Sequence, residues 1–157
     1  MTGHDHFLEQ VTALLPALRA FGRSPPSGTQ VTVLSRTTLT PYSGMLPGLV
    51  AGCYRRDESH IDLPWLAQAT GCEFVEAECV GLDLNRGEIQ CSNGGRSGYD
   101  VLSLDVGSAP ALVLGAEANV LPVKPADRFL SRWEASEARI ASGEFEHIAV
   151  VGGGAGG

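Results

Sequence analysis

The chain has 157 residues, of which 11 are lysine or arginine and 18 are aspartate or glutamate, so its formal net charge is −7. This acidic balance argues against a general binder of nucleic-acid backbones, which would be basic. Hydrophobic residues make up 43% of the chain and charged residues 18%, which allows a buried core and argues against disorder. The sequence contains no apolar run of about 18 residues, so no transmembrane segment is expected.

The four cysteines and the first residues indicate the compartment. No two cysteines form a C-x-x-C pair, and their gaps fit no zinc ribbon or finger. We therefore expect reduced, partly buried thiols without a metal or redox role. The N-terminal residues have no basic segment followed by an apolar one, so they do not resemble a secretory signal. Together these features predict a cytoplasmic location.

The first third of the chain predicts a helix, a loop and a strand. Apolar residues between positions 7 and 21 recur at helical spacing, with Asp5 as a plausible N-cap, Gly22 as a stop and a kink at Pro16. Residues 24–28 are typical of a loop, and the β-branched residues 30–35 predict a buried strand. Residues 40–54 contain four early glycine or proline breaks, which predict a long loop with at most one short helical piece.

The rest of the chain predicts an α/β layer fold with a small antiparallel insertion. The expected elements are a helix at 63–69, strands at 73–84 and 87–92 followed by turn residues 93–95, a strand at 99–105, a helix at 126–142 and a strand at 148–151.

The chain ends on a glycine pattern that follows the apolar residues 148–151 directly. Gly152, Gly154 and Gly157 occupy the three glycine positions of G-x-G-x-x-G. In nucleotide-binding folds the first glycine allows a tight turn, the second lets backbone amides approach a pyrophosphate, and the third lets a helix pack closely. Two interpretations stay open: a glycine-rich tail, or the first strand and loop of a nucleotide-binding domain that continues beyond the chain.

The N-terminus permits a similar pair of interpretations. Gly3 stands where a first glycine loop would end, but no strand precedes it. The alternative is an ordinary helix start capped by Asp5. A doubly wound sheet without its first strand would have a central gap flanked by unpaired backbone groups. We expect residues 148–151 to fill that gap.

Three segments carry a resemblance to a known family: TPYSGMLPGLVAG (40–52), YDVLSLDVGSAP (99–110) and VVGGGAGG (150–157). The sequence resembles the FAD-dependent pyridine nucleotide-disulfide oxidoreductase superfamily, in its type II NADH dehydrogenase-like branch. The nearest subgroup is the bacterial one associated with selenide, water dikinase. The resemblance implies a Rossmann-like FAD/NAD(P)-binding fold, truncated at both ends. Residues 1–146 would form a partial FAD-binding domain without its first strand, and 147–157 would begin a NAD(P)H-binding domain.

The resemblance also assigns cofactor contacts. Gly3 and His4 fall on the loop that holds the FAD pyrophosphate, although Met1 stands where a glycine is expected. Ser35 replaces the acid that many relatives present to the adenosine ribose, and a hydroxyl can still hydrogen-bond there without the charge. Arg36 would cover the adenine or meet a phosphate, and its alternative is a surface arginine.

Further assignments concern the flavin side. The resemblance places the small residues Ser43 and Gly44 where backbone amides approach the flavin, with Tyr42 as a shield. The backbone of Cys79 would meet the adenine. Asp105 and Gly107 fall on a turn whose backbone approaches FAD. A turn-forming aspartate is the alternative for Asp105.

The reaction that the resemblance implies is hydride transfer from NAD(P)H to FAD, followed by electron transfer to an unidentified acceptor, with a functional link to selenide, water dikinase. The paired catalytic cysteines of the disulfide-reducing members are absent from the sequence, which disfavours their chemistry. Two alternatives remain: a non-catalytic nucleotide-binding or structural remnant of such an enzyme, and a small domain for another nucleotide. We expect the chain by itself to be inactive in NADH oxidation.

Overall fold

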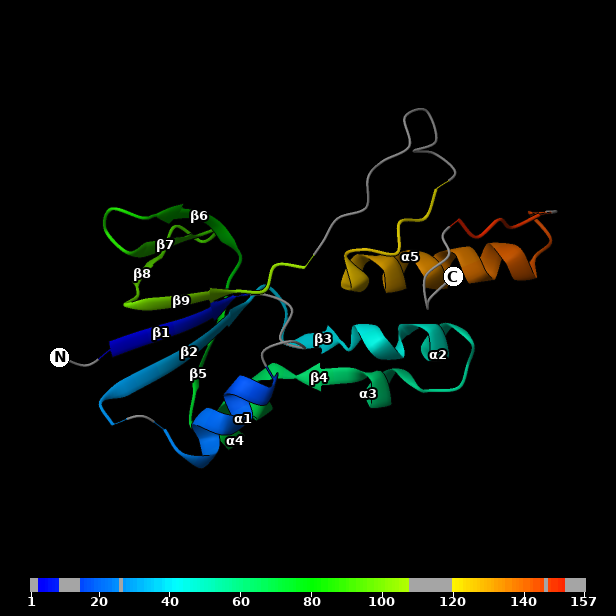
Figure 1. Cartoon of the computed structure of the whole chain (residues 1–157). Coiled ribbons are helices and arrows are strands. Elements are labelled where there is room, and N and C mark those ends of the chain that lie inside the picture. Colours follow the sequence, from blue (N-terminus) through cyan, green and yellow to red (C-terminus); the bar gives the residue numbers. More distant parts are fainter. Residues whose placement is uncertain (1–2, 9–14, 26, 108–119, 146, 152–157) are drawn as a thin grey trace. The chain divides into compact units, whose positions relative to one another are not determined.

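The computed structural model describes residues 3–8, 15–25, 27–107, 120–145 and 147–151. Two compact units divide the chain. Unit 1 comprises Met1–Thr40 and His60–Gly107, and unit 2 comprises Pro41–Ser59 and Ser108–Gly157. Figure 1 gives the labels of their helices and strands.

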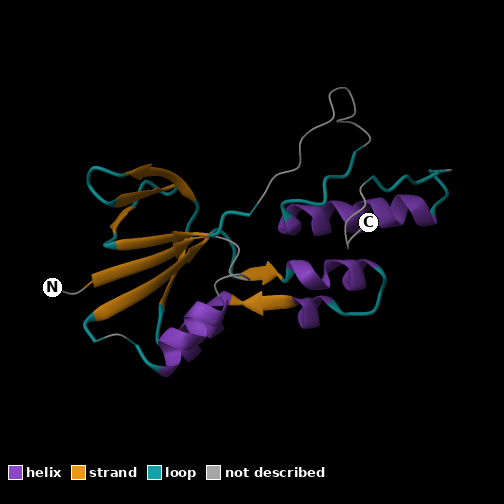
Figure 2. Cartoon of the chain, viewed as in Figure 1, coloured by secondary structure: helices purple, strands orange, loops and turns teal. Residues whose placement is uncertain are grey.

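Unit 1 is built on a sheet of four parallel strands in the order β5-β2-β1-β9. Their bounds are Gly3–Leu8 for β1, Thr29–Ser35 for β2, Glu73–Glu76 for β5 and Val101–Leu104 for β9. Because the strands are parallel, their carboxyl ends meet at one edge of the sheet, which Figure 2 shows with the strands in orange. This edge positions the candidate site.

Two helices, α1 (Leu15–Arg23) and α4 (Leu63–Thr70), pack on one face of the sheet. Because successive side chains of β2 lie on opposite faces of the sheet, Val31 and Val33 pack against these helices and Leu34 lies on the other face. Helix α4 begins where the Asp62 carboxylate accepts a hydrogen bond from the Trp65 N–H, 2.9 Å away. The buried cluster on this face consists of Leu18, Val31, Val33, Leu63 and Leu66.

The small antiparallel insertion that the sequence predicted is a sheet of three strands, one more than expected, and it covers the opposite face. Its strands are β6 (Cys79–Asp83), β7 (Glu88–Cys91) and β8 (Arg96–Gly98), in that order. The expected single strand at 73–84 is divided into β5 of the main sheet and β6 of the small sheet, with residues 77 and 78 between them. The buried cluster here consists of Leu34, Ala77, Ile89 and Cys91.

Unit 2 contains more regular structure than the predicted long loop. Its first segment forms η1 (Ser43–Met45), α2 (Leu46–Val50) and α3 (Arg56–Ser59). On either side of this segment, β3 (Leu39–Pro41) and β4 (His60–Asp62) pair with each other, and both belong largely to unit 1. The long helix α5 spans Ala126–Ala141, as expected. Its buried residues Ala126, Phe129 and Leu130 pack with Leu46 of α2.

The structure corrects two predictions about the central strand. The expected helix from residue 7 is wrong at its start, because Phe7 and Leu8 belong to β1 and α1 begins at Leu15. Strand β1 lies between β2 and β9, in the slot that was predicted to lack its own strand. Pairing with two neighbours satisfies its backbone groups there, and a local helical pattern cannot reveal such pairing.

The proposed replacement strand is also wrong. Residues 147–151 have no strand structure, and the side chains of Ile148, Val150 and Val151 are 60%, 74% and 94% exposed. They therefore do not fill a gap in the sheet of unit 1. Their assignment to the start of a NAD(P)H-binding domain stays a prediction.

Candidate functional site

The carboxyl edge of the unit 1 sheet gathers several polar residues as the chain leaves its strands. Arg36 follows β2, Glu78 lies two residues beyond β5, and Asp105 and Gly107 follow β9. In open α/β sheets, ligands bind outside the carboxyl ends of the strands. The topology therefore brings Ser35, Arg36, Asp105 and Gly107 to one edge, as the predicted cofactor contacts require.

The exits of β2 and β5 are tied together around Ser35, which is only 4% exposed. Its carbonyl oxygen accepts a hydrogen bond from the Ala77 N–H at 2.9 Å, and its hydroxyl oxygen accepts one from the Thr37 N–H at 3.3 Å. The hydroxyl is thus engaged in a local turn. It keeps its own proton as a donor for a further partner.

Arg36 and Glu78 form a charged pair at this exit. Arg36 Nη1 lies 4.0 Å from Glu78 Oε1, and the two side chains are 25% and 46% exposed. Sequence reasoning missed Glu78. Two features of the sequence could have indicated Glu78. The end of β2 has no acidic residue, and Glu76 and Glu78 lie at or just after the end of β5, the parallel strand beside it.

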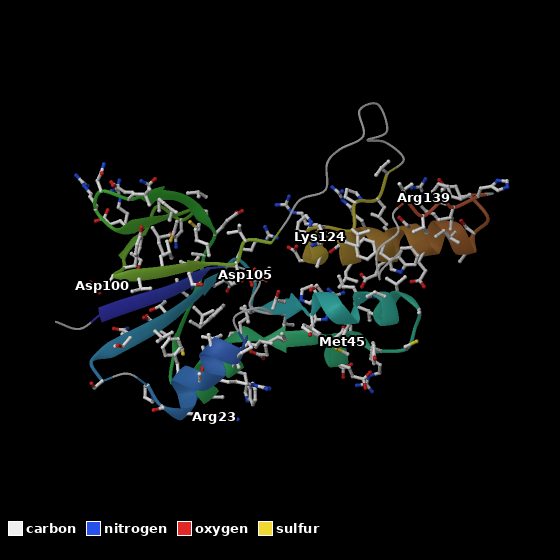
Figure 3. All side chains as sticks on the ribbon, viewed as in Figure 1. Arg23, Met45, Asp100, Asp105, Lys124 and Arg139 are labelled. Carbon is white, nitrogen blue, oxygen red and sulfur yellow. The ribbon has the colours of Figure 1, made fainter. Side chains whose placement is uncertain are left out.

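Asp105 has an unusual environment at the exit of β9. Its Oδ2 atom is buried and has no hydrogen-bond partner among the residues that the structure describes. Burying a carboxylate oxygen without a partner is costly, so such atoms indicate strain or a missing ligand donor. Figure 3 shows Asp105 and Asp100 at opposite ends of β9. Gly107 follows with a φ of 67°, a left-handed conformation that favours glycine.

The predicted flavin-facing residues lie in unit 2. Tyr42, Ser43 and Gly44 are all exposed, and the Met45 N–H donates a hydrogen bond of 2.9 Å to the Tyr42 carbonyl oxygen. A Cβ atom on Gly44 would stand 3.2 Å from the Tyr42 ring, so the ring lies close against this glycine. The turn thus presents an aromatic ring and a bare backbone to solvent. Its approach to a flavin stays a prediction.

Two predicted phosphate-binding residues are in the wrong place for that role. Gly3 and His4 begin β1, and Gly3 is paired with Thr29 at the amino edge of the sheet, opposite Ser35 and Asp105. They therefore do not belong to a loop at the carboxyl edge. The six residues after β1, at positions 9–14, contain no glycine. Gly152, Gly154 and Gly157 lie outside the described residues.

Cys79 begins β6 and stands opposite Cys91 of β7 in the antiparallel register. Its predicted backbone contact with adenine stays a prediction. Among the described residues, no three His, Cys, Asp or Glu side chains cluster as metal ligands. Nor is any described helix long and apolar enough to cross a membrane.

Comparisons with known proteins define the class of fold. No family model and no curated protein matches the sequence. Similar solved structures include the sulfide:quinone oxidoreductase from Aquifex aeolicus, with a TM-score of 0.69 and 18% identity over 88% of this chain and 32% of that chain. NDH2 from Plasmodium falciparum in complex with NADH has a TM-score of 0.70 and 16% identity over 95% of this chain and 32% of that chain.

A third similar structure is the NADH:rubredoxin oxidoreductase from Clostridium acetobutylicum, with a TM-score of 0.67 and 13% identity over 88% of this chain and 37% of that chain. The chain thus spans about a third of the length of these proteins. The predicted fold class is confirmed: the chain has the α/β, Rossmann-like FAD/NAD-binding fold found in such oxidoreductases. At these identities the likeness establishes the fold alone.

Proposed function

We propose that this chain is the FAD-binding part of a flavin-dependent oxidoreductase that passes a hydride from NAD(P)H to FAD and electrons to a further acceptor. The observation that carries the proposal is the buried, unpartnered Oδ2 of Asp105 at the carboxyl edge of a Rossmann-like sheet. When bound, FAD would supply the hydride and electron chemistry, while the protein supplies binding and orientation.

Asp105 favours a particular part of the cofactor. A carboxylate only accepts hydrogen bonds at neutral pH and repels phosphate, so its partner is a hydroxyl or N–H donor. The hydroxyl groups of the ribityl chain or of the ribose are such donors. A hydrogen bond from one of them would satisfy Oδ2, which has no partner among the described residues. Gly107, two residues further on, lacks a side chain that would keep the ligand from the backbone.

Arg36 and Glu78 suit the adenosine end of the cofactor. Glu78 can accept from ribose hydroxyls in place of the acid that is absent at Ser35, and Arg36 can stack on adenine or contact a phosphate. Arg36 and Glu78 both lie at the edge of the sheet where ligands bind in this class of fold. This position distinguishes them from an ordinary surface ion pair.

The remaining assignments rest on the sequence resemblance. It gives Tyr42, Ser43 and Gly44 to the flavin ring, and Gly152, Gly154 and Gly157 to NAD(P)H. The same resemblance supports the finer placement in the type II NADH dehydrogenase-like branch, in the bacterial subgroup linked to selenide, water dikinase. The reduced thiols expected from the cysteine spacing support a cytoplasmic location.

One observation favours a second candidate, a non-catalytic nucleotide-binding or structural remnant. In nucleotide-binding folds the loop after the first strand is rich in glycine, which lets backbone amides reach the pyrophosphate. Here residues 9–14 read Glu-Gln-Val-Thr-Ala-Leu. A sequence without glycine at these positions disfavours close contact with a diphosphate.

A titration with FAD separates the two candidates. Purified protein should form a yellow complex with about one FAD per chain. Asp105→Asn should weaken FAD binding about 10- to 100-fold, as expected for a lost hydrogen bond to a charged group. Asp100→Asn is the matched control, because Asp100 lies at the other end of β9. Its affinity should equal that of the unaltered protein.

Two results would contradict the proposal. A colourless protein at saturating FAD would favour the remnant. Equal FAD affinities of Asp105→Asn and the unaltered chain would show that Asp105 does not contact the cofactor.

A further inference from the structure

Cys79 and Cys91 are opposite each other in the small antiparallel sheet, next to a register shift between Cys79 and Gly81. The Cys91 N–H donates to the Gly95 carbonyl oxygen at 2.9 Å, and the Cys91 carbonyl oxygen accepts from the Gly94 N–H at 3.0 Å. Both backbone groups of Cys91 therefore point away from β6. The next residue, Ser92, donates its N–H to the Glu78 carbonyl oxygen at 2.9 Å. Cys79 and Cys91 thus form a non-hydrogen-bonded pair.

This type of pair brings two side chains close together. Opposed Cα atoms in a non-hydrogen-bonded antiparallel pair are about 4.5 Å apart, and their side chains leave the sheet on the same face. A disulfide spans Cα separations of about 4.4–6.8 Å. The two cysteines also share one hydrophobic cluster, in which Cys91 is buried and Cys79 is packed at the periphery. The register therefore meets the geometric requirement for a bond between them.

The other two cysteines are placed differently. Cys72 packs with the cluster on the α1 and α4 face of the sheet, and Cys53 is an exposed residue of unit 2. Neither belongs to the cluster that contains Cys79 and Cys91. They serve as internal controls for thiol chemistry.

We propose that Cys79 and Cys91 are a redox-active pair that forms a reversible cross-strand disulfide with a low-molecular-weight disulfide as oxidant. This inference goes beyond the proposed flavin function and does not depend on it. The pair differs from a C-x-x-C motif, since its members meet only when the hairpin folds. It revises the expectation that all four thiols are inert.

The exchange proceeds in two balanced steps. The Cys79 thiol, which is the more accessible of the two, loses its proton and attacks one sulfur of the oxidant. A mixed disulfide forms, the oxidant's S–S bond breaks, and one small thiolate leaves and takes up a proton. The Cys91 thiolate then attacks Cys79 Sγ, and the second small thiol leaves. Two protein thiols are oxidised, and one small disulfide is reduced to two thiols.

The environment of Cys91 favours Cys79 as the first thiol to react. Burial raises the pKa of the Cys91 thiol, and the neighbouring Cys79 raises it further. Cys91 is therefore less reactive than Cys79 toward an external oxidant, and its proximity to Cys79 favours the second step. The finished bond would join β6 to β7 beside Glu78, the residue before Cys79.

To test the proposal, the full, reduced chain is treated with oxidised glutathione, and the remaining free thiols are blocked with N-ethylmaleimide. The peptides are then mapped by mass spectrometry. Trypsin cleavage after Arg86 separates Cys79 from Cys91, and a glutamate-specific protease separates Cys72 from Cys79 at Glu76 or Glu78. We expect a Cys79–Cys91 cross-linked peptide, lighter by two hydrogen atoms than its reduced components. Dithiothreitol should reverse it completely.

Three variants make the result decisive even where folding is affected. Cys91→Ser should accumulate a glutathione adduct on Cys79, since the second step is blocked. Cys79→Ser should leave Cys91 unmodified, and Cys72→Ser should form the cross-link as the unaltered chain does. The proposal is overturned if Cys79 and Cys91 both remain alkylated after oxidation, or if the disulfides found join Cys53 or Cys72 instead.

Discussion

The Ala77 N–H donates a hydrogen bond to the Ser35 carbonyl oxygen over 2.9 Å, so the exits of β5 and β2 are held together at the carboxyl edge of the unit 1 sheet. This bond continues the ladder of the two parallel strands by one residue beyond β5. The residues that follow Ser35 and Ala77 are therefore close together, and Arg36 Nη1 lies 4.0 Å from Glu78 Oε1. A backbone interaction thus sets the position of the charged pair.

Replacing Arg36 by Gln should weaken binding of both FAD and ADP by about tenfold, because a charged hydrogen bond or stacking interaction with the adenosine end is lost. The free energy of unfolding should change by no more than about 0.5 kcal/mol, since the pair with Glu78 is partly exposed. Isothermal titration and urea denaturation measure the two effects. Arg96→Gln is the control, because Arg96 forms a similar surface pair with Glu88 at 3.2 Å. Equal nucleotide affinities for the two variants would exclude Arg36 from the site.

Asp105→Asn should stabilise the protein without cofactor, although it weakens FAD binding. A neutral amide is less costly to bury than an unpartnered carboxylate, so the free energy of unfolding should rise by about 1 kcal/mol. Urea denaturation in the absence of FAD measures the change, with Asp100→Asn as control. Destabilisation by Asp105→Asn would mean that the carboxylate has a stabilising partner within the folded chain.

Ile89→Ala should destabilise unit 1 by about 3 kcal/mol, because Ile89 is fully buried between the small sheet and the main sheet. Leu84→Ala, at a residue that is 78% exposed, should change the free energy of unfolding by less than about 0.5 kcal/mol. Chemical denaturation followed by circular dichroism compares the variants. Similar losses at both positions would show that the small sheet does not cover the main sheet as described.

The raised pKa of Cys91 predicts a pH dependence under reducing conditions. Because burial favours the neutral thiol, its contribution to stability is complete below the ordinary pKa of 9.0 and is lost as the pH rises through the higher value in the folded protein. The free energy of unfolding should therefore fall as the pH rises above about 9. Cys91→Ser should show a shallower decline, whereas Cys53→Ser, at an exposed site, should keep the original slope. Identical slopes in all three proteins would contradict burial of the Cys91 thiol.

Much of the fold follows from local sequence patterns. The strand predicted at 30–35 is β2 (Thr29–Ser35), and the helix predicted at 63–69 is α4 (Leu63–Thr70). Both have strong local signals, namely β-branched residues in one and an Asp62 cap in the other. The N-terminal segment was predicted wrongly because a helical apolar pattern and a central parallel strand compete there. Pairing with distant strands decides the outcome, and spacing along the chain does not reveal it.

The candidate site was predictable only in part. Ser35, Arg36, Asp105 and Gly107 lie at the carboxyl edge because each ends or follows a strand that the sequence indicated. The contribution of Glu78 depends on how β5 pairs with β2, which is a long-range property. The Cys79–Cys91 pair had no local signal, because the register of β6 and β7 shifts between Cys79 and Gly81 and this shift places Cys79 opposite Cys91.

Hydrogen–deuterium exchange with and without FAD tests the central claim most directly, because it maps the ligand onto the sheet edges. We predict slower exchange on FAD binding in peptides that contain residues 35–37, 76–79 and 105–107. Residues 27–30 and 98–101, at the amino edge, should exchange at unchanged rates. Protection confined to the amino edge, or no change anywhere at saturating FAD, would contradict a cofactor site at the carboxyl edge.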